Sequence, residues 1–423
     1  MKLQIFNLIK KQPAPEGQKD TSKGILSWGI NNSKPKQIID TINGSITGGA
    51  CINTLRRYVY GSGLTVEPDF EVSKDLTAFA FHRQLSSQIV KLRGVAVLVK
   101  YTVEGKASIT KIPFESCRLG IPDEQGDIFK IHYNPYFGLP DYRDEHTVIY
   151  DTYNPDPAVI KEQITEAKGF KKYKGQVMWK AVNSEFNEFY PLPEWFGNNK
   201  GKGGGKKWME IEQLVGDFHE HNIEKGFLEN VLMKLIGDPD DAIPEHVEKK
   251  AKNEKYTTVG DAFEEMMNNK FSGATGDKML VLWSKVTGEF PELEAFPAET
   301  HHDLFLALQK LSTENILIAT QVPPVLAGVK VSGTLSKDDI VNAVKLMWGN
   351  VEDEQQFLEE IYNELFPRLI KPWNEKVFIT NYSPIAMGVD PLIWDVMTDK
   401  EKREWVTENT DIELDGLQEP ADN

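Results

Sequence analysis

The sequence predicts an α+β fold spread over more than one structural part, and three observations carry this prediction. The chain has 423 residues, which is long for one domain of about 100–200 residues. Its composition, with 40% hydrophobic and 26% charged residues, is that of a folded protein rather than a disordered one. Short alternating apolar runs dominate residues 94–150, whereas apolar side chains at helical spacing dominate residues 300–366.

The first half of the chain is predicted to hold most of the strands. Residues 1–35 contain several prolines and weak patterning, so we expect an arm there and a first helix near Lys36, interrupted at Gly48-Gly49. A second helix is expected over Leu76–Leu92. Short runs bounded by turn residues then predict four strands: Gly94–Thr102, Ala107–Pro113, Asp127–Tyr133 and His146–Tyr150.

The middle of the chain is predicted to be a helix followed by a small strand-bearing segment. Gly197–Lys207 holds five glycines and four lysines, a composition typical of a flexible basic loop. A long helix is expected from Trp208 to Lys225, because apolar residues recur there at helical spacing. The expected elements that follow it are a strand at 227–236, a charged helix at 244–267 and a strand at 278–283.

The last third is predicted to be two long helices joined by a proline-containing segment. We expect the first helix from Thr300 and the second over 337–366. Pro323 and Pro324 fix φ near −65° and remove two amide donors, so the first helix must end before them. Gly328 and Gly333 lie in the connection that follows. The segment could hold a loop that projects from a rigid frame, or be an ordinary helix–helix connection.

A search for catalytic chemistry yields no candidate catalytic, metal or cofactor residues. Gly197–Lys207 does not fit a phosphate-binding loop, which needs Gly-Lys followed by Ser or Thr between a strand and a helix. The clusters at His219–His221 and His301-His302 lack the i, i+4 spacing of a helical zinc site. Cys51 and Cys117 are the two cysteines and fit a reducing compartment. We also expect no secretory signal and no membrane-spanning segment.

Charge is the unusual feature of the composition. The formal net charge is −16, which excludes a protein that coats nucleic acid with its whole surface. Residues 338–423 hold 20 acidic and 7 basic side chains, and so carry most of the excess. A solvated acidic tail is the common interpretation of such a region.

Several segments occur in a characteristic order along the chain: Ile42–Leu64, Tyr190–Trp195, Asp217–His219, Lys225–Phe227, Asp303–Ala319, Val322–Gly328 and Gln355–Leu365. These segments and their order resemble bacteriophage portal proteins, the rings at the capsid vertex of tailed double-stranded DNA phages. The resemblance covers about residues 36–410. The Gly197–Lys207 segment departs from the family pattern, and residues 130–190 match no part of it that we recognise.

The resemblance implies a portal-protein fold whose parts can be assigned along the chain. Residues 1–35 would form an N-terminal arm and 36–206 an α+β wing. The stem helices would be 207–225 and 300–319, on either side of a small α/β clip at 226–299. The remaining parts would be a tunnel-loop region at 320–336, a long wing helix at 337–366 and an acidic crown and tail at 367–423.

The resemblance also implies a function without catalysis. A homo-oligomeric ring of about twelve copies would form the channel for genome packaging and ejection at one capsid vertex of the virion, after assembly in the host cytoplasm. Its partners would be terminase, a head–tail adaptor, the major capsid and scaffolding proteins, and double-stranded DNA that passes non-specifically. No cofactor, metal or membrane is implied. Lys330, Ser332 and Thr334 would be the tunnel-loop residues that touch the DNA backbone.

Two other classes of protein remain open at this point. One is a non-ring head–tail connector or scaffold protein. The other is a cytosolic α+β enzyme that uses Gly197–Lys207 as a lid over its substrate. An enzyme would show a concave pocket with converging ionisable groups of shifted pKa. For Lys330, a solvent-exposed lysine without a role is the alternative interpretation.

Overall fold

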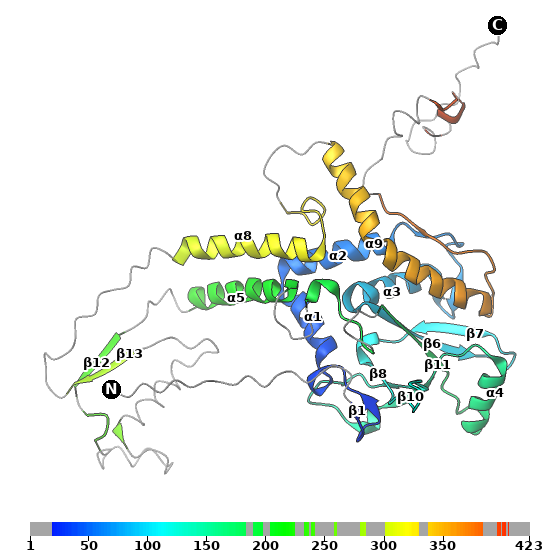
Figure 1. Cartoon of the computed structure of the whole chain (residues 1–423), viewed down its shortest axis with the longest axis horizontal. Helices are drawn as coiled ribbons and strands as arrows, with labels where there is room; N and C mark the ends of the chain where they lie inside the picture. Colours follow the sequence, from blue (N-terminus) through cyan, green and yellow to red (C-terminus); the bar gives the residue numbers. More distant parts are fainter. Residues whose placement is uncertain are drawn as a thin grey trace, which may run out of the picture. The chain divides into compact units, whose positions relative to one another are not determined.

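The computed structural model describes residues 19–182, 189–197, 204–224, 232–236, 238–241, 258–259, 280–284, 301–329, 337–383, 396–398, 400–402 and 405 (Figure 1). The chain divides into two compact units. One consists of residues 1–210 together with 313–423, and the other of residues 211–312. Within the described ranges, every helix is too short or too polar to cross a membrane.

The fold class is α+β, as predicted, and the centre of the first unit is a six-stranded sheet. Its strand order is β7-β6-β11-β10-β9-β8. Strands β10 and β11 are parallel, and all other neighbours are antiparallel. The strands are β6 (Gly94–Tyr101), β7 (Ala107–Lys111), β8 (Cys117–Leu119), β9 (Lys130–Tyr133), β10 (Val148–Thr152) and β11 (Gln176–Ala181).

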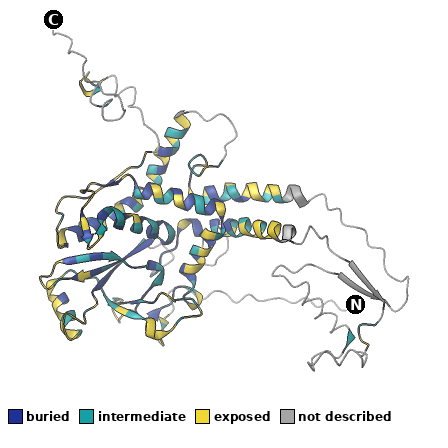
Figure 2. Ribbon diagram, turned by 180° about the vertical axis from the view of Figure 1, so that it is seen from behind, coloured by how far each residue is buried: buried dark blue, intermediate teal, exposed yellow. Residues whose placement is uncertain are grey.

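Four long helices pack with this sheet and with one another. They are α1 (Lys34–Gly44), α2 (Ile46–Tyr60), α3 (Ala78–Leu92) and α9 (Lys337–Leu365). Helix α3 lies against β6, because Phe81, Leu85 and Ile89 form a fully buried stripe at helical spacing. Helices α2 and α9 pack on α3, so that dark-blue buried positions line their inner sides (Figure 2). The N-terminus of α3 is capped by Thr77, whose hydroxyl accepts from the Ala80 amide at 3.3 Å.

The first helical region differs from its prediction. The interruption lies at Ser45, not at Gly48-Gly49, and Ser45 caps α2 by accepting from the Gly48 amide at 2.8 Å. The two glycines lie inside α2. A Cβ at Gly48 would come within 2.8 Å of the Met209 sulfur, so the glycine is there because two helices approach closely.

The C-terminal part of the chain completes the first unit. Strand β14 (Ile379–Thr380) pairs antiparallel with β3 (Gly63–Leu64). The Gln355 side chain on α9 donates to the Tyr58 carbonyl on α2 at 2.9 Å. Segments about 300 residues apart in sequence therefore share one hydrophobic core.

Three elements of the sheet region have no counterpart in the prediction. They are β8, β11 and α4 (Pro157–Glu166). Helix α4 lies between β10 and β11, as the crossover that a parallel strand pair needs. Strand β8 is only three residues long and fully buried, so alternation gives no signal for it. The four predicted strands correspond to β6, β7, β9 and β10, with ends shifted by up to three residues.

A buried arginine joins the N-terminal segment to the sheet edge. Arg118 on β8 is fully buried, and its guanidinium donates to both the side-chain oxygen (3.0 Å) and the carbonyl (2.7 Å) of Asn32. It also donates to the carbonyls of Glu115 and Cys117, and lies 4.8 Å from the ring centroid of Phe137. Burial lowers the pKa of Arg118 to about 10, so the group stays charged at neutral pH.

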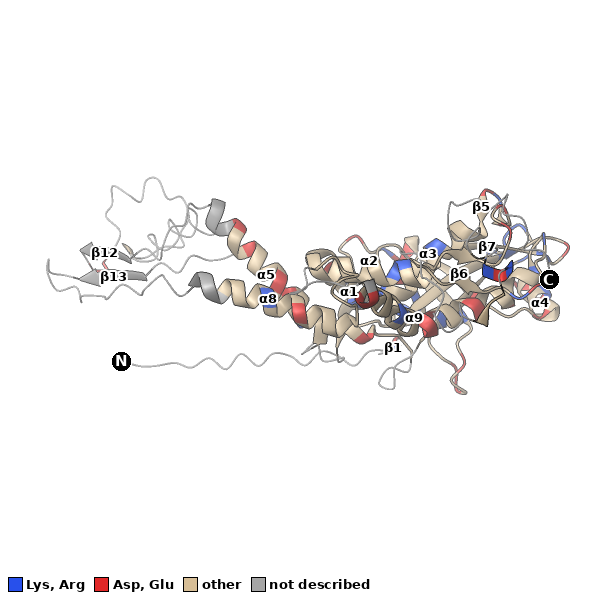
Figure 3. Ribbon diagram, turned by 90° about the horizontal axis from the view of Figure 1, so that it is seen from above, with Lys and Arg blue, Asp and Glu red and all other residues tan. Residues whose placement is uncertain are grey.

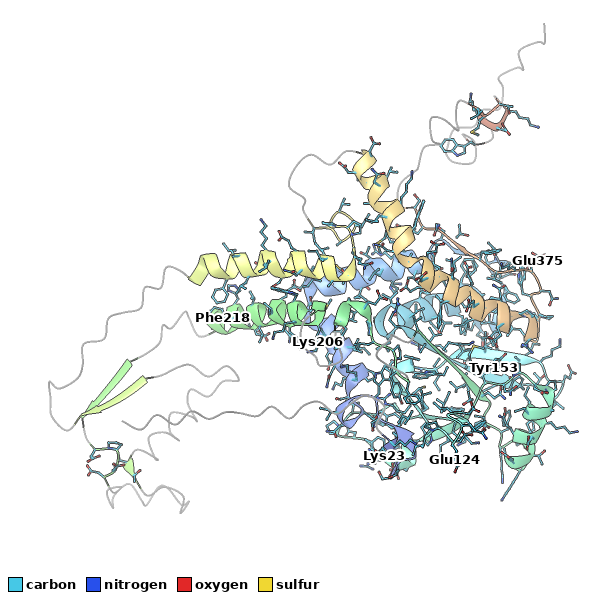
Figure 4. The ribbon with its side chains drawn as sticks, viewed as in Figure 1. Lys23, Glu124, Tyr153, Lys206, Phe218 and Glu375 are labelled. Carbon is cyan, nitrogen blue, oxygen red and sulfur yellow. The ribbon has the colours of Figure 1, made fainter. Side chains whose placement is uncertain are left out.

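The second unit holds a parallel strand pair and the outer parts of two helices. Strands β12 (Leu232–Ile236) and β13 (Leu280–Ser284) confirm the two strands predicted there. Helices α5 (Gly204–Glu224) and α8 (His301–Thr320) each run from one unit into the other. Within the second unit, Phe218 of α5 stacks on Phe305 of α8 with ring centroids 4.4 Å apart (Figure 4 labels Phe218). The helix predicted at 244–267 falls almost entirely outside the described residues.

The remaining described elements are short. They are the strands β1 (Lys19–Asp20), β2 (Ile25–Leu26), β4 (Glu71–Ser73) and β5 (Leu76–Thr77), and 3-10 helices at Ile30–Asn32, Phe114–Ser116, Asp144–His146, Glu194–Phe196 and Phe366–Arg368. Strand β1 pairs with β2, and β4 pairs with β5.

Candidate functional site: the segment between α8 and α9

The C-terminus of α8 ends in a left-handed residue rather than at the prolines. Gln321 has φ 55°, and its amide donates to the Ile318 carbonyl at 3.2 Å. The Val322 amide donates to the Leu317 carbonyl, also at 3.2 Å. This pair of bonds is a Schellman motif, and the buried side chains of Val322 and Leu317 are at the positions whose contact often accompanies it.

The two prolines form a second turn directly after this stop. The Leu326 amide donates to the Pro323 carbonyl at 2.9 Å, and the Val329 amide donates to the Pro324 carbonyl at 3.0 Å. Gly328 has φ 76°, a left-handed conformation that favours glycine. Pro323, Pro324 and Gly328 therefore lie in a turn closed by two backbone hydrogen bonds.

Side-chain hydrogen bonds from α9 and α2 hold this turn on two sides. The Asn350 side chain of α9 donates to the Gln321 carbonyl at 2.8 Å. The Thr54 hydroxyl of α2 donates to the Leu326 carbonyl at 3.3 Å. Leu326, Ala327 and Val329 are half-buried against the core. Residues 321–329 consequently form a fixed turn rather than a free linker.

The residues predicted to touch DNA follow this turn. Lys330, Ser332 and Thr334, together with Gly333, lie outside the described residues. Their segment begins after Val329, which is half-buried, and ends where α9 begins at Lys337. Both of its ends are thus positioned by described structure.

A small pocket adjoins the start of the turn at Gln321, and a cluster of ion pairs forms part of its lining. Arg93, the left-handed C-cap of α3, binds the carboxylate of Glu354 on α9 and also donates to Glu194 at 2.8 Å. Burial raises the pKa of the Glu354 carboxyl, and the charge of Arg93 offsets part of that rise. The pocket is lined by Leu55, Val59, Val90, Arg93, Glu194, Trp195, Ala319, Thr320, Gln321, Asn350, Val351 and Glu354.

Sequence reasoning missed the residues that hold this site together. Gln321 gives no signal, because glutamine is not a residue that favours a helix C-terminus. Thr54, Arg93 and Asn350 are ordinary polar positions in the sequence, and only the packing of α2, α3 and α9 brings them to the turn.

The glycine- and lysine-rich segment is only partly what was predicted. Its last four residues, Gly204–Lys207, form the first turn of α5, so the helix begins four residues before the predicted start at Trp208. A Cβ at Gly205 would lie 2.6 Å from the Trp195 carbonyl, which is why close packing requires glycine there. Lys206 forms an ion pair with Glu210 one helical turn later (Figure 4). Residues 198–203 lie outside the described residues.

The histidine clusters and the two cysteines are the other candidates from the sequence. His219 is exposed and lies edge-on to the Phe218 and Phe305 rings. In the described part of the chain, no group of three histidine, cysteine, aspartate or glutamate side chains could hold a metal ion. Cys51 and Cys117 are both buried, and neither forms a disulfide.

Comparison with known proteins gives similarity at the level of solved structures. No protein-family model matches the chain, and no curated protein matches it. A neck structure of the native gene transfer agent particle, computed with C12 symmetry, has a TM-score of 0.49 and 10% identity over 88% of this chain and 93% of that one. The virion of the native gene transfer agent particle gives 0.47 and 11% over the same shares.

A third similar structure is a phage portal protein. The crystal structure of a HK97-family phage portal protein from Corynebacterium diphtheriae has a TM-score of 0.35 and 11% identity, over 85% of this chain and 97% of that chain. The chain is therefore similar, over most of its length, to a portal protein and to gene transfer agent neck and virion structures.

Proposed function

We propose that this chain is the subunit of a portal-type ring, a structural protein without catalytic activity. The ring would form a channel for packaging and ejecting double-stranded DNA at one vertex of a capsid, with about twelve copies around its axis. It would dock terminase during packaging and neck or tail adaptors afterwards, and contact the major capsid and scaffolding proteins. The sequence resemblance over residues 36–410 motivates the proposal.

The observation that carries the proposal is the anchored turn at 321–329. A loop that projects into a channel must start and end on a frame that does not move when DNA passes. Here the Schellman motif at Gln321, the Pro323 turn and the Asn350 hydrogen bond fix the start of residues 330–336. The beginning of α9 fixes the end. In the proposed ring, Lys330, Ser332 and Thr334 would face the channel.

Electrostatics is consistent with a channel through which DNA slides. Every phosphate that a protein neutralises releases counterions and adds affinity, which would slow passage. A chain with a net charge of −16 repels the duplex instead, and one lysine per subunit in the loop gives only weak backbone contact. We propose that the carboxylates of residues 338–407, apart from the ion-paired Glu354, face the channel or the capsid interior.

The test is the state of assembly of the purified full-length chain. We expect negative-stain images with rotationally averaged rings, and a native mass of roughly 600 kDa for about twelve copies of a 47.9 kDa chain. A chain that stays monomeric at micromolar concentration, alone and with the capsid and scaffolding proteins of its own particle, would contradict the proposal.

Substitution of Lys330 tests whether the loop takes part in the contacts that assemble the ring. Lys330→Glu should leave ring mass and ring images unchanged, with Lys330→Met as the neutral control, because the loop is proposed to face the channel rather than a neighbouring copy. Collapse of the ring in both variants would show that the loop is part of the assembly contacts.

A further inference from the structure

A strongly basic turn follows α4 in the first unit, on an otherwise acidic chain. Residues 168–174, termed here the basic turn, have the sequence Lys-Gly-Phe-Lys-Lys-Tyr-Lys and contain no acidic side chain. All four lysines are exposed, and Phe170 between them is 38% exposed. Lys161 on α4 and Lys100 on β6 are also exposed, and a Cβ at Gly175 would lie 3.3 Å from Lys100 Cγ. Lysines and a large apolar side chain are thus presented together.

The basic turn has a defined conformation. The Gly169 amide donates to the Ile164 carbonyl and the Lys168 amide to the Thr165 carbonyl, both at 3.0 Å, which is a Schellman motif at the end of α4. The Tyr173 hydroxyl donates to the Gln163 side-chain oxygen at 2.9 Å. The surface is therefore held in place before any partner arrives.

One lysine of this surface occupies a position that favours glycine. Lys168 has φ 59°, a left-handed conformation that is unfavourable for a residue with a Cβ. A lysine near a helix C-terminus gains a small electrostatic benefit from the helix dipole. That benefit applies to one position and does not account for Lys171, Lys172 and Lys174, which lie beyond the helix.

The charge of the basic turn is not neutralised within the described part of the chain. No ion pair there involves Lys168, Lys171, Lys172 or Lys174. Asp151 lies near Tyr173, whose pKa it helps to raise, but its carboxylate already binds Lys130 at 2.5 Å. Glu162 and Glu166 on α4 are exposed and outnumbered by the lysines. The surface therefore has the charge to bind an anionic partner.

The chain carries a segment of matching chemistry at its C-terminal end. Residues 408–422 hold six carboxylates, no lysine or arginine, and the apolar side chains Ile412, Leu414 and Leu417. We propose that this acidic segment binds the basic turn of the same chain, its carboxylates on the lysines and an apolar side chain on Phe170. The inference concerns a surface that the proposed function does not use.

The length of the connecting chain and the effective concentration favour the acidic segment over nucleic acid as the partner of the basic turn. Glu408 follows Ser383, the end of the continuously described range 337–383, by 25 residues, which can extend to at most roughly 85 Å. A unit of about 300 residues has a radius of gyration of only roughly 19 Å. Because the acidic segment is tethered to the same chain, its effective concentration at the basic turn is on the order of millimolar, so weak ion pairs are enough to hold it there. Nucleic acid would instead have to approach a chain of net charge −16.

Zero-length carbodiimide cross-linking of the full-length protein, read by mass spectrometry, tests the contact. We expect amide links between the lysines of 168–174 and the carboxylates of 408–422, within one chain when isotopically light and heavy proteins are mixed. K171E/K172E should lower their yield roughly fivefold or more, because two attractions become repulsions. K36E/K106E, the same charge change at two other exposed lysines, should leave the yield unchanged.

A charge swap and a DNA control make the result decisive. Adding E413K and D415K to K171E/K172E should restore links between the two segments, whereas general damage to the fold would not be rescued. Absence of links, links that K171E/K172E leaves unchanged, or links only between light and heavy chains would overturn the proposal. So would retarded migration of a short DNA duplex that K171E/K172E abolishes while no links form, since nucleic acid would then be the occupant.

Discussion

His82 shows how one buried polar side chain joins three helices of the first unit. Its Nε2 lies 2.9 Å from the Tyr60 carbonyl of α2, and a carbonyl can only accept, so Nε2 carries the proton. Nδ1 must then accept from the Tyr362 hydroxyl of α9, at 2.8 Å. The neutral ring satisfies both neighbours, and a second proton would place a positive charge in a buried site. Burial lowers the pKa of His82 to about 4.

This burial predicts a pH dependence of stability with a definite sign. The unfolded chain binds a proton at His82 near pH 6.5, whereas the folded protein does so only near pH 4. Between these values the unfolded state holds more protons, so the free energy of unfolding falls as pH is lowered. The contribution of His82 is roughly 3 kcal/mol across the window.

Urea unfolding at pH 7.0, 5.5 and 4.5 measures this effect. His82→Gln cannot titrate, so the pH-dependent loss of stability should be smaller in the variant, by up to about 3 kcal/mol. Subtracting the free energy of unfolding of the variant from that of the wild type at each pH removes the contribution of the carboxylates that both proteins share. Equal losses in the two proteins would show that His82 does not remain neutral in the folded state.

At the scale of elements, the end of α8 separates what a sequence pattern predicts from what it misses. The prolines predict that a helix stops before residue 323, and α8 does stop there. The residue that turns the chain is Gln321, which has φ 55° without being a glycine or asparagine. Its carbonyl is held by Asn350, so a contact from α9 helps to maintain a conformation that local preference disfavours.

Gln321→Gly should therefore stabilise the protein. Glycine adopts the left-handed conformation without the Cβ penalty and keeps the carbonyl that Asn350 contacts, so we expect a gain of about 0.5–1 kcal/mol in the free energy of unfolding. Gln321→Ala keeps the Cβ and should give no such gain. Chemical denaturation of the three proteins compares them directly, and equal stability of the glycine and alanine variants would contradict a left-handed residue 321.

The glycine-rich stretch gives a second example at this scale. Composition predicts a flexible loop, yet Gly204 and Gly205 belong to the structured start of α5, where neighbouring backbone leaves no room for a Cβ. Glycine favours flexible loops and also fits where backbone segments approach closely, and only the positions of Trp195 and Gly197 show that close approach applies at Gly204 and Gly205. Composition alone cannot, because it contains no information on what packs nearby.

At the scale of the molecule, the first unit is built from two separate stretches of sequence, so contacts between residues far apart in the chain must hold these stretches together. Arg93 and Glu354 are 261 positions apart, and their side chains are only 17% and 15% exposed. Glu194, the other partner of Arg93, is 71% exposed. Removing Arg93 leaves the Glu354 carboxylate without this partner in a poorly solvated place, and removing Glu354 leaves Arg93 with only the exposed Glu194.

A double-mutant cycle measures the coupling energy between Arg93 and Glu354. Arg93→Met and Glu354→Gln should each cost about 2–3 kcal/mol of unfolding free energy. Their sum should exceed the cost in the double variant by about 1–2 kcal/mol. Glu194→Gln removes the exposed partner of the same arginine and should cost less than about 0.5 kcal/mol. Additive costs for Arg93 and Glu354 would show that the pair does not couple α3 to α9.

Charge is distributed at this scale as well. Acidic positions are marked in red along α9 in Figure 3. The exposed ones include Glu352, Asp353 and Glu360, while the side chains of Glu354 and Gln355 contact Arg93 and Tyr58. The acidic excess of residues 338–423 is therefore not one uniform surface. Part of it holds the first unit together, part is exposed on α9, and the part at 408–422 is the segment proposed to bind the basic turn.

The sequence by itself determined the fold class, the long helices, four strands of the sheet and the proline turn. These follow from local causes: the spacing of apolar residues, the fixed φ of proline and the preference of glycine for positive φ. The tertiary structure decided the parallel pairing of β10 with β11, the left-handed Gln321, the buried Arg118 and the joining of Arg93 to Glu354. Each of these depends on which distant segment lies alongside, and that is set by burial of a shared core rather than by local preference.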